Sequence, residues 1–182
     1  MSETRAVQVV AAYDLSPSSQ IALDRAIDVV ARAPHHVLHV ITVLQKVSYE
    51  RAEAMQATVR DHVAQGFESR SLAGPVEFFI HCRIGKATHE ILRLAEEVGA
   101  EMIFIGSHGR VSIERFLLGS TSEVVVREAR CPVMVVRERT YKDVELEKVV
   151  EYDHPHDNYI PPHRYSYVET RLLARPADWP LI

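Results

Sequence analysis

The chain has 182 residues, of which 25 are acidic, 21 are basic and 47% are hydrophobic, and its formal net charge at pH 7 is −4. This composition is typical of one globular domain that is long enough to bury a core without disulfides or a structural metal. The slightly acidic balance and the lack of a basic stripe exclude general electrostatic binding to nucleic acid or to an anionic membrane.

The N-terminal residues and the cysteine content predict where the protein works. The chain enters its first apolar run directly, without the charged segment, long apolar region and cleavage site of an export signal. No run of about eighteen apolar residues could cross a bilayer. Two cysteines, Cys82 and Cys131, are too few for a disulfide framework and suit a reducing compartment. We expect a cytoplasmic protein.

The N-terminal third predicts a strand, a helix and a second strand. The first strand is expected at 7–13 and the helix at 17–33, where Ser16 can cap the helix and Pro17 fits its first position. The apolar stripe of this helix consists of Leu23, Ala26, Ile27 and Val30. A second apolar run predicts a strand at 36–43.

The middle of the chain repeats this order. Residues 50–70 predict the second helix, because apolar side chains recur at three- and four-residue spacing at Ala52, Met55, Val59 and Val63. A strand is expected at 75–81 and a third helix at 88–98, with Gly99 placed to end it.

The last elements complete an α/β pattern. Strands are expected at 101–106 and 132–137, with the fourth helix starting near Ser120. The five strand segments are nearly continuous apolar runs, as in strands that are buried on both faces. Such alternation predicts an open five-stranded doubly wound parallel sheet, a three-layer α/β/α, Rossmann-like fold. Ligands of such sheets bind at the carboxyl ends of the strands, which directs attention to the loops after the first, second and fourth strands.

The loop after the fourth strand carries the most specific motif. Gly106 and Gly109 follow the strand directly, and Gly119 precedes Ser120 at the start of the fourth helix, with the spacing G-x2-G-x9-G-[ST]. Glycines allow tight turns and a close approach of the backbone to a ligand. The free N–H groups of a helix start, with hydroxyls beside them, form an anion site of the kind that phosphates occupy.

This string resembles the signature of the universal stress protein family, in its nucleotide-binding branch. Further matches are Tyr13-Asp14-Leu15-Ser16 after the first strand, Leu38-His39-Val40 in the second, the turn at Gly85 and Cys131-Pro132 before the last strand. The resemblance implies a nucleotide-binding domain over residues 1–138 with a fold like that of the adenine nucleotide alpha hydrolases. Residues 139–182 then form a C-terminal extension.

The same resemblance implies a role for each site residue. Asp14 would lie beside the adenosine, and the backbone of Val40 would read the adenine edge. Gly106 and Gly109 would hold ribose and phosphate. The phosphates would lie on Gly119 and Ser120, with Ser122 as a further candidate. The ligand would be ATP, or ADP or AMP, accompanied by Mg²⁺.

Structural roles compete with each of these assignments. Asp14 suits a turn at the helix entry, the glycines suit loop geometry alone, and Ser120 suits a plain helix cap. His108 and Arg110 are expected to be solvated loop side chains. The cysteines are expected to be packed thiols.

The function implied by the family resemblance is regulatory. An adenine-nucleotide-binding regulator of the cytoplasmic stress response would change its conformation and its protein partner with nucleotide state. No motif gives His108 or Glu123 a catalytic role, so at most slow ATP hydrolysis is expected. Two alternatives share the fold: a ligand-free dimeric interaction protein, and a flavodoxin-like electron carrier, for which Tyr13 is the only support.

The extension at 139–182 holds five of the nine prolines and the only tryptophan, Trp179. Its aromatic residues predict docking on the core or on a partner subunit, within a homodimer that pairs through the last strand. Its histidines, His154, His156 and His163, are weak candidates for a transition-metal site and suit polar packing better.

Overall fold

The computed structural model describes residues 5–45, 48–108 and 118–137. Within them, strands and helices alternate as β1 (Val7–Ala12), α1 (Pro17–Arg32), β2 (His36–Leu44), α2 (Tyr49–Glu68), β3 (Glu77–Ile84), α3 (Ala87–Val98), β4 (Met102–Gly106), α4 (Ser120–Glu128) and β5 (Val133–Val136). All strand pairs are parallel, and the order is β3-β2-β1-β4-β5. The predicted doubly wound α/β fold is confirmed.

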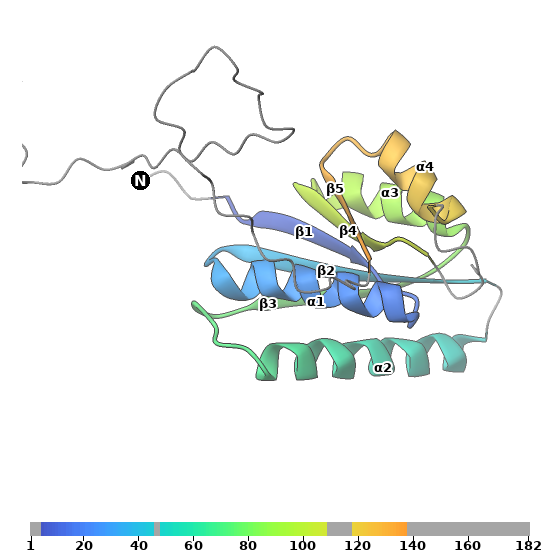
Figure 1. Ribbon diagram of the computed structural model, residues 1–182. Helices are drawn as coiled ribbons and strands as arrows, with labels where there is room; N and C mark the ends of the chain where they lie inside the picture. The colour runs from blue at the N-terminus through green and yellow to red at the C-terminus, as the bar shows by residue number, and fades with distance from the viewer. Residues whose placement is uncertain (1–4, 46–47, 109–117, 138–182) are drawn as a thin grey trace, which may run out of the picture. The chain divides into compact units, whose positions relative to one another are not determined.

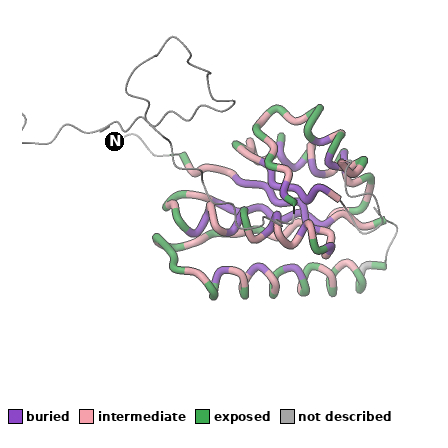
Figure 2. The backbone as a smooth tube through the Cα atoms, viewed as in Figure 1, coloured by how far each residue is buried: buried purple, intermediate pink, exposed green. Residues whose placement is uncertain are grey.

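Two layers of helices cover the sheet. Helices α1 and α2 lie on one face, and α3 and α4 lie on the other (Figure 1). One apolar cluster fills the space under α1 and α2, around Val9, Leu38 and Phe104. A second cluster lies under α3 and α4, around Val10, Ile41 and Ile103. Figure 2 shows the buried backbone concentrated in the central strands and in the inner sides of the helices.

The edge strands differ from the prediction in burial and length. Nearly continuous burial holds for β1, β2 and β4. Strands β3 and β5 have mixed burial because, in the part of the chain that the structure describes, each has a neighbouring strand on one side only. Phe79 on β3 and Met134 on β5 are therefore 44% and 48% exposed. Strand β3 also continues to Ile84, three residues beyond the predicted end, because its residues 82–84 pair with β2.

Helix boundaries follow the local chemistry that the sequence predicts. The hydroxyl of Ser16 accepts a hydrogen bond from the Ser19 N–H at 3.2 Å, and Pro17 occupies the first turn of α1. Helix α3 ends at Gly99, whose φ of 63° places it in the left-handed region that favours glycine. None of the described helices is long and apolar enough to cross a membrane.

A hydrogen-bonded histidine pair lies on the α3 side of the sheet. His39 on β2 is buried, and its Nδ1 lies 3.0 Å from Nε2 of His81 on β3. Burial, and then the neighbouring His81, lower the pKa of His39 to about 4. Burial also lowers the pKa of His81, helped by the Arg83 charge and opposed by the Glu97 carboxylate. Both imidazoles are neutral at pH 7.

This arrangement predicts an acid-sensitive fold. An unfolded histidine takes up its proton near pH 6.5, whereas folded His39 does so near 4, so the unfolded state binds more protons in between. Stability therefore falls as the pH is lowered, with a loss from His39 of about 2 kcal/mol between pH 7 and pH 5. Urea unfolding is measured at pH 7 and at pH 5 with a chelator in the buffer. The free energy of unfolding is expected to fall less between these pH values for His39→Gln than for wild type. Equal losses would contradict this.

Candidate functional site

A cavity of about 470 Å³ opens at the carboxyl end of the sheet, where the strand order changes direction between β1 and β4. Its walls come from the ends of β1, β2 and β4, from the start of α3 and from the first turn of α4. The lining residues are Ala12, Tyr13, Asp14, Ile41, Val43, Gln45, Ala87, Ile91, Ile105, Gly106, His108, Gly119, Ser120, Thr121 and Ser122. The cavity lies where the fold and the loop motif together predict a ligand site.

The N-terminus of α4 faces this cavity. Gly119 occupies the N-cap position and has no side chain that could accept from the first turn. The N–H groups of Ser120, Thr121 and Ser122 belong to the turn that an α-helix leaves without intrahelical partners. They give this end of the cavity a positive partial charge. Ser120 is exposed, so a ligand can reach this turn from solvent.

Hydrogen bonds tie α4 to the ends of two strands. The Ser122 hydroxyl donates to the Gly106 carbonyl at 2.7 Å, so this side chain holds α4 against β4. The Gly119 N–H donates to the Ser107 carbonyl, and the Ser107 N–H donates to the Val136 carbonyl at the end of β5. Ser122 therefore has a structural role in addition to the ligand role that the sequence predicts.

Gly106 is required by packing against α1. A Cβ at this position would lie 2.5 Å from the Ser18 hydroxyl oxygen, 2.7 Å from the Ser18 carbonyl carbon and 2.8 Å from the Ser19 nitrogen. Real Cβ atoms do not approach backbone this closely, so glycine lets the start of α1 pack directly on the end of β4. Gly109 and Arg110 lie outside the described residues.

Asp14 makes the turn that the sequence predicts and also lies on the wall of the cavity. Its Oδ1 accepts a hydrogen bond from the Ser16 N–H at 3.0 Å, which forms the turn into α1. The same residue is only half-buried and lines the cavity. A carboxylate has several acceptor positions, so the turn bond is compatible with the ligand role that the sequence predicts for Asp14.

Strand β2 lines the cavity with side chains near its carboxyl end, and the backbone role expected of Val40 stays a prediction. The Val40 side chain is fully buried in the cluster under α1 and α2, and this residue is not among the described residues that line the cavity. Ile41, Val43 and Gln45 line it instead. Their alternate spacing at the carboxyl end of the strand is the sequence signal that could have identified them.

His108 is not the solvated side chain that the sequence suggests. It lines the cavity, and its Nε2 is buried without a hydrogen-bond partner among the described residues. The Ser107 hydroxyl lies 2.9 Å from its Nδ1, and the Ser18 hydroxyl donates to its backbone carbonyl. Because buried polar atoms are rarely unsatisfied, this nitrogen is the atom of the cavity wall for which a hydrogen-bond partner remains to be supplied.

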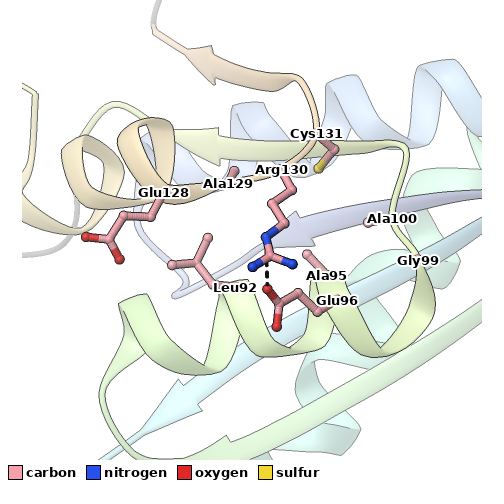
Figure 3. Close-up of a pocket in the computed structure, with 9 residues that line it drawn as sticks. All are labelled: Leu92, Ala95, Glu96, Gly99, Ala100, Glu128, Ala129, Arg130 and Cys131. Atoms are coloured by element: carbon pink, nitrogen blue, oxygen red, sulfur yellow. Dashed lines mark ion pairs between the residues drawn. The ribbon is translucent and has the colours of Figure 1, made fainter.

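A second cavity, of about 350 Å³, lies between the C-terminal ends of α3 and α4 (Figure 3). Its apolar wall includes Leu92 and Ala95, and an ion pair of 3.6 Å joins Arg130 to Glu96 across it. Cys131 also lines it, and burial raises the pKa of this thiol above its usual value. Of the predicted site residues that the structure describes, none lines this cavity.

Comparisons with known proteins agree with this geometry. The universal stress protein family model matches residues 8–137. Universal stress protein G of Shigella flexneri is 36% identical over 109 residues, which is 56% of this chain and 76% of that protein.

Solved structures show the same fold. The universal stress protein UspA from Lactobacillus plantarum matches with a TM-score of 0.59 at 24% identity, covering 73% of this chain and 99% of that one. A universal stress protein solved in complex with cAMP matches with a TM-score of 0.54 at 24% identity, covering 72% and 97% of the two chains. From its sequence match and its fold, the chain belongs to the universal stress protein family.

Proposed function

We propose that this protein binds an adenine nucleotide in the cavity at the carboxyl ends of β1, β2 and β4. The observation that carries the proposal is the meeting of an apolar-walled cavity with the N-terminal turn of α4, which has no side chain at its cap. An apolar wall suits a base, and a helix N-terminus suits a phosphate. The relative in complex with cAMP supports an adenine ligand for this fold.

The lining suggests how the ligand would lie. Ile41, Val43 and Ile91 provide an apolar wall for the base, and Asp14 provides an acceptor for ribose hydroxyls. The phosphates would lie on the first turn of α4. When Ser107 donates its hydroxyl to Nδ1 of His108, Nε2 carries the proton and can donate to a phosphate or ribose oxygen.

The proposal has three finer parts: the nucleotide is ATP, Mg²⁺ binds with it, and the protein acts as a regulator. The hydroxyls of Ser120 and Thr121 are hard oxygen ligands at the phosphate end, so they fit a magnesium ion that is held mainly by the phosphates. We assign no catalytic residue. The proposed role is a cytoplasmic stress regulator whose homodimer changes its protein partner with nucleotide state. The extension at 139–182, with His154, His156 and His163, lies outside the described residues.

The observations favour an adenine-nucleotide-binding protein over a flavodoxin-like electron carrier. Such a carrier would hold the flavin phosphate at the start of α1. In this protein the Ser16 hydroxyl already accepts from the first turn of α1, and Ser19 donates its own hydroxyl back to the Ser16 carbonyl. Among the described residues that line the cavity, Tyr13 is the only aromatic side chain apart from His108.

The test is to purify the full chain without added nucleotide, denature it and identify released adenine nucleotides, and then to titrate the emptied protein with ATP, ADP, AMP and cAMP, with and without Mg²⁺. We expect one adenine nucleotide per chain, or saturable binding at one site. A protein that releases none and whose melting temperature does not change with any of them contradicts the proposal and favours the ligand-free interaction protein.

A further inference from the structure

The histidine pair on β2 and β3 is separate from the nucleotide cavity. Side chains alternate along a strand, and His39 and His81 point to the α3 side of the sheet together with Gln8 of β1. None of the three lines the cavity. His39 is buried, and Phe79 stacks on its ring with centroids 5.2 Å apart.

Hydrogen bonds fix which nitrogen of each ring carries its proton. The Gln8 amide nitrogen donates to the Ala6 carbonyl at 3.1 Å, so its amide oxygen faces His39. That oxygen lies 2.7 Å from Nε2 of His39, which must therefore be the protonated nitrogen. Nδ1 of His39 is then unprotonated, and its lone pair faces Nε2 of His81, which lies 3.0 Å from it.

This is the arrangement of a metal-binding histidine. A histidine ligand commonly donates its other N–H to an oxygen, which fixes the ring and raises its basicity, as Gln8 does for His39. Two nitrogens on a tetrahedral zinc ion lie about 3.3 Å apart, given Zn–N bonds of about 2.0–2.1 Å. The observed separation of 3.0 Å needs to open by a few tenths of an ångström, and the two rings need to rotate so that both lone pairs converge on the ion instead of lying along the line between the nitrogens.

We propose that Nδ1 of His39 and Nε2 of His81 bind one divalent transition-metal ion of the Zn²⁺ class. When the ion binds, His81 exchanges its Nε2–H tautomer for the Nδ1–H tautomer, so the pair stays neutral and no net proton is released. The described residues contain no group of three His, Cys, Asp or Glu side chains placed to hold a metal. The remaining coordination positions are therefore filled by water or a small exogenous ligand.

The surroundings of the histidine pair allow a metal ion to enter. His81 is only partly buried on edge strand β3, so an ion can reach the pair from solvent. The charges of Arg83 and Glu97 act on His81 in opposite directions, and the effect of Arg83 on its pKa is the larger one. Arg83 is itself paired with both Glu90 and Glu97, and Arg93 also pairs with Glu97, so the charges beside the site balance.

The test is a zinc titration of the full chain by calorimetry, compared with His81→Gln and with His89→Gln as a matched control on exposed helix surface. Wild type and His89→Gln are expected to bind one more zinc equivalent than His81→Gln, or to bind it at least tenfold more tightly. Because other histidines bind zinc weakly, the same titration is followed by imidazole nitrogen NMR. Zinc is expected to move the His81 proton from Nε2 to Nδ1.

Two outcomes overturn the proposal. One is a zinc stoichiometry and affinity that are the same in His81→Gln and His89→Gln. The other is an unchanged tautomer of His81 in wild type at saturating zinc. Circular dichroism of His81→Gln checks that the fold is intact, and the NMR measurement on wild type decides the matter if that variant fails to fold. Neither readout depends on the nucleotide site.

Discussion

Gly106→Ala is expected to lower the free energy of unfolding by about 3 kcal/mol or more in the absence of any ligand. The new methyl group would lie 2.7 Å from the Ser18 carbonyl carbon and 2.8 Å from the Ser19 nitrogen. Both are backbone atoms in the first turn of α1, so a side-chain rotation cannot relieve the collision. The measurement is urea unfolding of the two proteins after nucleotide has been removed.

Gly74→Ala is the matched control. A Cβ at Gly74 has no neighbour within 4 Å, so this variant is expected to be close to neutral or slightly stabilising. A double variant, Gly106→Ala with Ser18→Ala, removes the hydroxyl and leaves the backbone in place. It is expected to recover little stability. Full recovery would show that the hydroxyl, rather than the close approach of α1, makes glycine necessary.

Ser120→Glu is expected to weaken nucleotide binding about 100-fold, or about 2.7 kcal/mol. This exposed residue begins α4, where we propose that the phosphates lie, and a carboxylate there would repel them. The same carboxylate interacts favourably with the helix N-terminus. The free protein is therefore expected to gain about 0.3–1 kcal/mol of stability at low salt.

These opposite signs separate binding from folding. Titration calorimetry gives the affinity, and urea unfolding of the free protein gives the stability. Ser71→Glu adds the same charge at an exposed position in the segment between α2 and β3, and it is expected to change neither quantity appreciably. Unchanged nucleotide affinity in Ser120→Glu would show that the phosphates lie away from α4. It would contradict the ligand orientation proposed above.

Local chemistry was enough to predict most of the fold. Ser16, Pro17 and Gly99 set helix boundaries through groups that lie within a few residues of each other, so the sequence shows them directly. The end of β3 at Ile84 was missed because pairing with β2, and not the apolar pattern, extends that strand. Burial at the edges depends on strand order, which apolar runs do not encode.

The site was predicted at the level of loops and less well at the level of atoms. The glycine motif identified the loop after β4 and the start of α4, both of which contribute to the cavity. The packing reason for Gly106 depends on α1, which is nearly ninety residues away in the chain. The buried Nε2 of His108 depends on its hydrogen-bonded neighbours Ser18 and Ser107. Such contacts are tertiary and leave no local pattern.

Ser107 joins the start of α4, at the cavity, to the end of edge strand β5 through two backbone hydrogen bonds. Its carbonyl accepts from Gly119 at the start of α4, and its N–H donates to Val136 where β5 ends. A displacement of the α4 turn must therefore either stretch one of these two hydrogen bonds or move Ser107 and the end of β5 with it. If the proposed nucleotide shifts the first turn of α4, β5 is the edge strand to which this turn is joined through Ser107.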